Sequence, residues 1–402
     1  MEPPARLTRR RLLQVGAALG SLPAVLAACA QVAPVVSESA RASGRSTSVA
    51  GSPIPSASPT PAAVPTRAKL YRGAAMADGR TASLQRPLSV LVDAGRIAWI
   101  RPTDGEDDPG DAEMIDASGA TIVPGMVDAH SHVTGQGGAR WIERFADDPA
   151  VLVATAEANG AAAWAAGIRW LRDAGSPVAV DPEDGEERAL ALGIRDRWAG
   201  VAGFPAIRAA GAWIMRSGTG IPVAPIEVAT ADDLVAAAVG QLDAGADFVK
   251  LYLDGPEPGV APWSGAEVAR VVAAAHERGA RVTAHAGHLG AARAAVAGGV
   301  DAIEHGFVLD ADVVAAMAAA GTMLVTTLSV LHSWLSFAST TASGRFVDGR
   351  RSHQAQLEAA ETSVRMARDA GVAIAAGTDF GGGSPRAGHI AWEVESLVRA
   401  GL

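Results

Sequence analysis

The chain contains 402 residues, of which 49% are apolar and 19% are charged, and its formal net charge at pH 7 is −9. This length fits one large domain with an appendage or two domains, and the apolar content is that of a globular protein with a core. The negative charge argues against a nucleic-acid-binding surface.

The first 29 residues, which include LTRRRLLQVGAALGSLPAVLAAC, have the pattern of an export signal. Arginines precede a short apolar run, and Gly and Pro interrupt this run too often for it to span a bilayer comfortably. The segment TRRRLLQ, residues 8–14, resembles the twin-arginine signal, and LAAC, residues 26–29, resembles the lipobox of bacterial lipoproteins. We therefore expect residues 1–29 to be a signal peptide and Cys29 to carry a lipid that anchors the exported protein on the outer side of the cytoplasmic membrane. The alternative is an incidental cysteine in a signal peptide that is removed.

Residues 30–66 are rich in Ser, Pro and Ala and lack a periodic apolar pattern, which predicts a disordered linker. Cys29, just before this linker, is the only cysteine in the chain, which excludes an internal disulfide.

Short β-rich segments fill residues 67–120. LSVLVDAGRIAWI, residues 88–100, consists of two such runs around Asp93, Ala94 and Gly95, a pattern that predicts a hairpin. Another short strand and glycine turns follow in EMIDASGATIVPG. We expect residues 67–120 to form a small β subdomain.

After residue 120, apolar strand-like runs alternate with alanine-rich helical runs. Two helix starts have capping-box spacing, Thr230 with Asp233 and Ser264 with Glu267. The alternation predicts an α/β fold with a (β/α)8 barrel over residues 121–402, with an open parallel sheet as the alternative. The eight predicted strands are Ile122–His132, Gly167–Asp173, Ala206–Ala212, Phe248–Leu253, Arg281–Ala286, Asp301–Gly306, Thr322–Leu328 and Val372–Asp379.

Residues that can bind a metal or transfer a proton stand at the carboxyl ends of these strands. His130 and His132 end the first strand, and their spacing places both imidazoles on one face of an extended chain. Four later strands each contribute one further side chain, and barrel enzymes build their sites at this end of the barrel. The residues on these later strands are Lys250, His285, His305 and Asp379.

These segments together resemble a known family. VPGMVDAHSH, ADFVKLYLDG, VTAHAG, VDAIEHG and AGTD resemble, in the same order, the motifs of the amidohydrolase superfamily, particularly its imidazolonepropionase-like and prolidase-like branch. The resemblance covers residues 67–402. It implies a metal-dependent hydrolase of carbon–nitrogen bonds in which a β-sandwich accompanies a (β/α)8 TIM barrel.

The resemblance also implies a role for each residue. His130 and His132 match ligands of the more buried metal, and His285 and His305 match ligands of a second metal. Lys250 matches a lysine that reacts with CO2 and bridges both ions as an N-carboxylate. Asp379 matches an aspartate that binds metal and carries a proton from the metal-activated hydroxide to the departing nitrogen.

The number and kind of metal ions stay open in the sequence. Imidazole and carboxylate ligands suit zinc, and also manganese, iron or cobalt. Relatives with a single metal need only His130, His132, His285 and Asp379, and Lys250 would then contact the substrate or be an unmodified relic. We expect the small-molecule substrate to be an amide, a cyclic amide or a dipeptide-like compound. The alternatives are a deaminase or an esterase with the same site, and a surface lipoprotein that binds a solute without catalysis.

Several segments depart from the family pattern, and several residues have only weak sequence support for a role. His288 lies three positions after His285, where relatives have a histidine two positions after the ligand, and RSGTG, residues 216–220, replaces a Gly-Gly-His segment. His288 and Tyr252 are candidate substrate contacts, whereas His276, His332 and His353 are assigned no role. GGGS, residues 381–384, is expected to be a flexible loop at the site. Because the chain ends at LVRAGL, we expect the barrel to be truncated in its last helix and the β-sandwich to be incomplete.

Overall fold

The computed structural model describes residues 67–402, except residues 82, 220–224, 343 and 385–386. The predicted signal peptide (1–29), the candidate lipid-anchored Cys29 and the predicted linker (30–66) lie outside the described residues. Within the described part, no helix combines the length and the apolar character that crossing a membrane requires.

The N-terminal part of the described chain is a five-stranded sheet with the order β3-β2-β1-β4, and its fifth strand, β5, pairs with β1. β2 and β3 form the predicted hairpin, in which Asp93 pairs with Arg96. Ala94 and Gly95 have φ values of 48° and 74°, as a tight hairpin turn between right-twisted strands requires. The elements are β1 (Lys69–Met76), β2 (Gln85–Asp93), β3 (Arg96–Pro102), a short helix η1 (Thr103–Gly105), β4 (Glu113–Asp116) and β5 (Thr121–Ile122).

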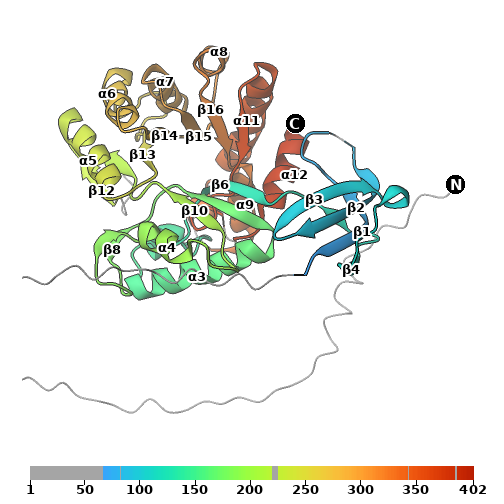
Figure 1. Ribbon diagram of the computed structural model, residues 1–402. Helices are drawn as coiled ribbons and strands as arrows, with labels where there is room; N and C mark the ends of the chain where they lie inside the picture. The colour runs from blue at the N-terminus through green and yellow to red at the C-terminus, as the bar shows by residue number, and fades with distance from the viewer. Residues whose placement is uncertain (1–66, 82, 220–224, 343, 385–386) are drawn as a thin grey trace, which may run out of the picture. The chain divides into compact units, whose positions relative to one another are not determined.

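All eight predicted barrel strands are present, and neighbouring strands pair in parallel (Figure 1). Together with β11 (Ile214–Arg216) and β12 (Ile226–Val228), they form a three-stranded sheet, β10-β7-β6, and a seven-stranded sheet, β12-β11-β13-β14-β15-β16-β17. The predicted strands correspond to β6 (Met126–Ser131), β7 (Ile168–Asp173), β10 (Ala206–Ala209), β13 (Phe248–Tyr252), β14 (Arg281–Ala286), β15 (Ala302–His305), β16 (Met323–Thr326) and β17 (Ile374–Ala376). Four short strands were not predicted: β8 (Val178–Val180), β9 (Glu187–Ala189), β11 (Ile214–Arg216) and β12 (Ile226–Val228).

Backbone hydrogen bonds link these two sheets at both edges. At one edge, Asp379 N–H donates to the His130 carbonyl over 2.8 Å, and His132 N–H donates to the Phe380 carbonyl over 2.8 Å. At the other edge, Asp247 N–H donates to the Ala209 carbonyl over 2.8 Å. The parallel strands therefore have the TIM-barrel-like arrangement that the sequence predicts.

Helices alternate with the strands and bury their apolar faces against them. Ser264 and Glu267 form the predicted capping box at the start of α6, and the Thr230 side chain caps α5. One core cluster contains residues of β13–β16 and α5–α8 with α11, and a second contains residues of β7 and β10 with α3 and α4. The helices are α2 (Trp141–Arg144), α3 (Pro149–Ala165), α4 (Leu190–Trp198), α5 (Ala231–Asp243), α6 (Gly265–His276), α7 (Leu289–Ala297), α8 (Ala311–Ala320), α9 (Leu328–Thr340), α10 (Gly344–Val347), α11 (Arg350–Asp369) and α12 (Ile390–Ala400).

Candidate active site

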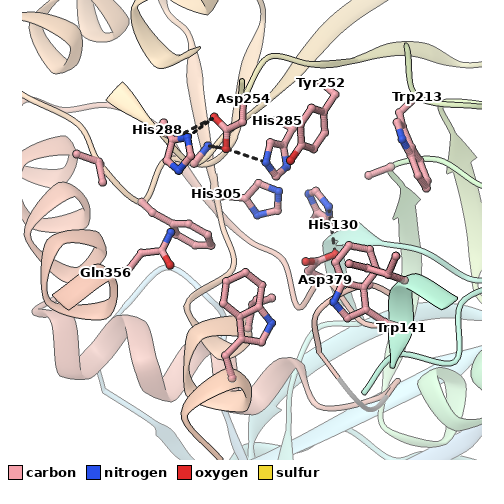
Figure 2. A pocket seen from close by; sticks show the side chains of 18 of the residues that line it. His130, Trp141, Trp213, Tyr252, Asp254, His285, His288, His305, Gln356 and Asp379 are labelled. Atoms are coloured by element: carbon pink, nitrogen blue, oxygen red, sulfur yellow. Dashed lines mark hydrogen bonds and ion pairs between the residues drawn. The ribbon is translucent and has the colours of Figure 1, made fainter. Parts of the chain in front are cut away.

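A cavity of about 840 Å³ lies at the carboxyl ends of the barrel strands (Figure 2). Loops at this end of a parallel barrel are the usual place for a catalytic site. The cavity is lined by all six residues that the sequence proposes as metal ligands: His130, His132, Lys250, His285, His305 and Asp379.

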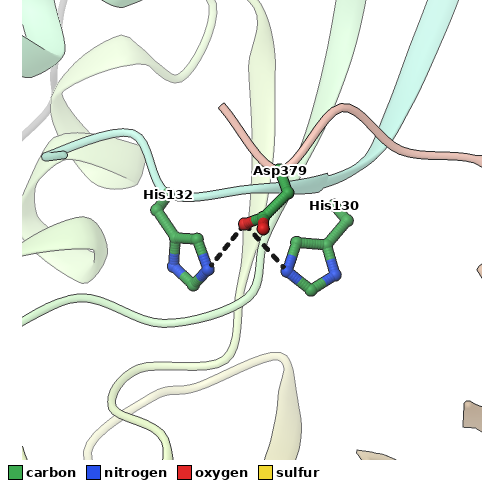
Figure 3. Close-up of side chains that lie close together, drawn as sticks. All are labelled: His130, His132 and Asp379. Carbon is green, nitrogen blue, oxygen red and sulfur yellow. Dashed lines mark ion pairs between the residues drawn. The ribbon is translucent and has the colours of Figure 1, made fainter. Parts of the chain in front are cut away.

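His130, His132 and Asp379 form a compact group at the end of β6 and just after β17 (Figure 3). Asp379 Oδ1 is 3.5 Å from His130 Nε2 and 3.3 Å from His132 Nε2. One potential ligand atom from each of the three residues lies within 4.8 Å of the others. Two imidazole nitrogens and one carboxylate oxygen at this spacing are a donor set that suits a divalent transition metal.

The other two histidines continue this group along the cavity. The ring centroids of His130 and His305 are 4.7 Å apart, and those of His305 and His285 are 4.4 Å apart. His305 and Asp379 have φ values of 71° and 51°, a strained conformation for residues other than glycine. Both residues stand at the ends of strands, and both line the cavity.

Each of the four histidines has one ring nitrogen held by a polar partner. Histidines that bind metals almost always have such a partner, because it fixes the tautomer and the orientation of the ring. The four imidazoles therefore fit a metal site. The pairs are His130 Nδ1 with Glu304 Oε2 (2.6 Å), His132 Nδ1 with the Gly175 carbonyl (2.7 Å), His285 Nε2 with Asp254 Oδ2 (3.0 Å) and His305 Nδ1 with Thr327 Oγ1 (2.8 Å).

The electrostatics favour neutral imidazoles at His130 and His305 beside an ionised carboxylate. For His132, burial is outweighed by the hydrogen bond with Asp379 and by the charge of Asp379, which raise the pKa above its ordinary value. Burial lowers the pKa of His130 to about 4, and burial together with His285 holds the pKa of His305 well below its ordinary value. Burial alone would raise the pKa of Asp379, but the hydrogen bond with His132 and the charge of His130 lower it below its usual value. Neutral imidazoles keep a lone pair for a metal, and an ionised carboxylate can accept a proton.

Lys250, on β13, is only 3% exposed. Among the described residues, no side chain forms an ion pair or hydrogen bond with its ammonium group within the distances that define them. Burial has the largest effect on the pKa of Lys250 and lowers it to about 8, although the negative charge of Glu304 acts in the opposite direction. A buried lysine with this pKa is partly a neutral amine near pH 8, and a neutral amine is a nucleophile.

Glu304 is a residue of the site that sequence reasoning missed. Its side chain is completely buried, and its carboxylate contacts His130, Arg172 and Thr283. Arg172 Nη1 lies 2.5 Å from Glu304 Oε1. Arg172 is not among the described residues that line the cavity, and it supports Glu304 from outside that lining. The sequence feature that could have indicated Glu304 is an acidic residue directly before His305 on a strand predicted to be buried.

Asp254 and His353 were also missed. Asp254 pairs with His285 and accepts hydrogen bonds from the backbone N–H groups of Gly287 and His288. His353, which was assigned no role, lines the cavity from α11. Asp254 ends the segment ADFVKLYLDG and could have been noticed there, whereas the position of His353 depends on how α11 packs.

The two candidate substrate contacts, Tyr252 and His288, both line the cavity. Tyr252 stacks on the His285 ring with centroids 4.0 Å apart, and His288 Nδ1 lies 3.8 Å from Asp254 Oδ1. The glycines after Asp379 allow close packing: a Cβ atom on Gly381 would lie 1.9 Å from the His132 carbonyl oxygen. Within RSGTG, Thr219 lines the cavity, and residue 220 lies outside the described residues.

Comparisons with known proteins agree with this geometry. The model of the amidohydrolase family matches residues 121–399. An uncharacterized protein of Mycobacterium tuberculosis is 34% identical over 317 residues, which cover 78% of this chain and 75% of the relative. A shorter segment of 83 residues is 36% identical to an imidazolonepropionase of Salinispora arenicola and covers 20% of each chain.

Two solved structures have a similar fold. A Xaa-Pro dipeptidase with bound methionine in its active site has a TM-score of 0.69 and 23% identity, over 83% of this chain and 84% of that one. A prolidase complexed with N-methylphosphonate-L-proline has a TM-score of 0.67 and 22% identity, over the same shares. Since the family model spans most of the chain, the chain belongs to the amidohydrolase family, and it is a metal-dependent hydrolase that acts on carbon–nitrogen bonds.

Proposed function

We propose that this hydrolase cleaves the C–N bond of a small amide, a cyclic amide or a dipeptide-like compound. The observation that carries the proposal is the convergence of four histidines and Asp379 on one cavity, each histidine with a polar partner behind it. The dipeptide-like class has support from the solved dipeptidase and prolidase structures, which share the fold.

The residues would hold one or two divalent ions. His130, His132 and Asp379 would hold the more buried ion, and His285 and His305 would hold the second. Zinc suits this mixed nitrogen and oxygen set, and manganese, iron and cobalt are alternatives. A bound ion lowers the pKa of a water molecule toward neutrality and polarises the substrate carbonyl.

Lys250 is the proposed bridge between the two ions. The neutral amine forms an N–C bond to the carbon of CO2 and releases one proton, which leaves an anionic carbamate with two oxygen donors. Two observations support this modification: the amine is buried among the metal-ligand candidates, and its pKa is lowered to about 8. A carbamate also removes the conflict between a lysine ammonium group and adjacent metal ions.

Asp379 is the proposed proton carrier. Its carboxylate accepts a proton from the attacking water and then donates that proton to the departing nitrogen, so it acts first as a base and then as an acid. Its contacts with His130 and His132 hold it beside the site of attack. Tyr252 and His288 would contact the substrate from the β13 and β14 side of the cavity.

Other functions are compatible with the same set of residues. A deaminase or an esterase needs the same ligands and the same Asp379. A solute-binding protein without catalysis needs no proton carrier, so the presence of Asp379 among the histidines favours an enzyme.

A substrate panel tests the proposal directly. Purified protein, reconstituted with zinc or manganese and bicarbonate, is incubated with N-acyl amino acids, Xaa-Pro dipeptides, hydantoins and lactams, together with an adenosine-type deaminase substrate and an ester. We expect hydrolysis of at least one amide class, and an about hundredfold to ten-thousandfold loss of rate in Asp379→Asn. Turnover of the deaminase substrate or the ester alone would contradict the proposed reaction.

We further propose that the protein is exported and held at the cell membrane by a lipid on Cys29. The support is the order of the arginine pair, the apolar run and the LAAC segment in the sequence. Its only proposed partner inside the cavity is a small molecule.

A further inference from the structure

One wall of the cavity is aromatic and lies next to the metal-ligand candidates. Trp213 packs edge-to-face on His132, with centroids 5.5 Å apart, and on Phe145, with centroids 5.5 Å apart. Trp141 extends this wall by an edge-to-face contact with Phe145 at 6.0 Å. Figure 2 shows Trp213 and Trp141 across the cavity from His288 and Gln356.

The position of Trp213 is fixed by its surroundings. The residue lies between β10 and β11 at the catalytic end of the barrel and is 6% exposed. Gly175 leaves the space that the indole fills, because a Cβ atom there would lie 2.6 Å from Trp213 Cε3. The ring is therefore preorganised before any ligand binds, as a good binding residue should be.

The indole N–H of Trp213 is a buried donor with no hydrogen-bond partner among the described residues. Trp334, which lines the same cavity, also has an Nε1 atom without a partner in the described part of the chain. Buried donors in native proteins are nearly always paired. A ligand oxygen in the cavity would supply the missing acceptor for Trp213.

The charge of the cavity restricts the kind of ligand. Among the described lining residues there is no arginine, and Lys250 is the single lysine. A free carboxylate is best held by an arginine fork, and Lys250 is the proposed metal bridge. Apolar side chains, including Phe307, Val308 and Val330, line much of the remaining surface.

We propose that Trp213 is a specificity-determining residue that selects amides with a neutral carbonyl oxygen next to an aromatic or bulky apolar group. Its indole N–H donates a hydrogen bond to that oxygen, and the aromatic wall of Trp141, Phe145 and Trp213 packs against the apolar group. This inference rests on the proposed function, and it narrows the substrate class from small amides in general to uncharged aromatic or branched amides, so that free dipeptides, which carry a carboxylate, fall outside it.

Binding can be tested without turnover by following the indole ¹H–¹⁵N signals of the nine tryptophans. Phenylacetone, acetone and toluene are suitable probes, because they offer a carbonyl with a ring, a carbonyl alone and a ring alone, and none has a C–N bond. The Trp213 signal is identified by its loss in Trp213→Phe. We expect phenylacetone to shift this signal downfield saturably and to bind about tenfold or more tightly than acetone, and toluene to give no downfield shift. A Trp213 signal that phenylacetone leaves in place, or equal affinities for the two ketones, would overturn the inference.

Turnover provides the second test, with the N-phenylacetyl and N-acetyl derivatives of 4-nitroaniline as substrates. We expect kcat/KM to favour the phenylacetyl compound by about tenfold or more, and Trp213→Phe to lower kcat/KM about fivefold by raising KM. Trp263→Phe is the matched control, because Trp263 also has a buried indole Nε1 without a partner in the described chain and lies outside the cavity lining. An equal effect of the two substitutions would overturn the inference.

The two tests separate this inference from the proposed function. If the Trp213 signal shifts as expected while no amide is hydrolysed, the proposed function fails and the binding role stands. If amides are hydrolysed while Trp213→Phe behaves like Trp263→Phe, the proposed function stands and the role of Trp213 is wrong.

Discussion

Glu304 holds the His130 imidazole from behind the cavity and is itself held by Arg172. These three residues come from β6, β7 and β15, and the Glu304 carboxylate is fully buried. Burial alone would raise the pKa of this carboxyl, but Arg172 and His130 lower it well below its ordinary value. An ionised Glu304 accepts the His130 Nδ1–H and leaves Nε2 free to face Asp379, which is the arrangement that a metal ligand needs.

Replacement of Glu304 by glutamine should therefore weaken metal binding. We expect an about tenfold to hundredfold loss of affinity for zinc, measured by competition with a chelator of known affinity. Glu393→Gln is the matched control, because Glu393 is also completely buried but bonds to Thr326, Leu328 and Ser329 rather than to a cavity histidine. Equal zinc affinities in the two variants would show that Glu304 has no special role toward the metal.

Lys250→Ala should remove the bridge between the two proposed metal ions. We expect elemental analysis to show the loss of one ion per chain, and short carboxylic acids to restore part of the activity because they can replace the carbamate oxygens. Unchanged metal content and rate in Lys250→Ala would show that the lysine does not bridge.

At the scale of secondary-structure elements, Glu393 connects α12 to the start of α9. Its Oε1 accepts from Leu328 N–H over 2.9 Å, and its Oε2 accepts from Ser329 N–H over 2.7 Å. These N–H groups belong to the first turn of α9, which has no partners for them within the helix. The same helix carries Val330 and Trp334 into the cavity wall, so a contact far from the chemistry fixes part of the site.

Loss of this contact should reduce stability. We expect Glu393→Gln to lower the free energy of unfolding by about 1–3 kcal/mol, measured by urea denaturation. Glu395→Gln on the same helix is the control, because the Glu395 side chain is 57% exposed and, among the described residues, pairs only with the exposed Arg399, and such pairs contribute little. Equal unfolding free energies for the two variants would contradict the anchoring role of Glu393.

The elements of the barrel could be predicted from the sequence because most strands are short runs rich in apolar residues and some helices carry local start signals. The metal-ligand candidates were also predictable, since they lie at the ends of those strands. Glu304, His353 and Trp213 were not, because their roles depend on contacts between segments distant in the chain. Glu304 and His130, for example, are separated by 174 positions. Burial of a charged residue becomes interpretable only when its partners are known.

At the scale of the whole molecule, the proposed lipid anchor and the catalytic domain are separate features of the chain. If Cys29 carries a lipid, the full-length protein should sediment with membranes, and Cys29→Ser should move it to the soluble fraction without a change in kcat/KM. Fractionation followed by immunoblotting measures this difference. Equal membrane association of the two forms would contradict anchoring at Cys29.

The barrel brings together six residues from five strands or strand ends, and the central claim is that they form a metal-dependent hydrolytic site. The most direct measurement is a titration of chelator-treated protein with zinc in the presence of bicarbonate, in which bound metal and amide hydrolysis are followed in the same samples. We predict that the rate rises in proportion to bound zinc and saturates at one or two ions per chain, and that His130→Ala abolishes both. Hydrolysis that is unaffected by metal removal, or stoichiometric zinc binding that survives in His130→Ala, would contradict the account.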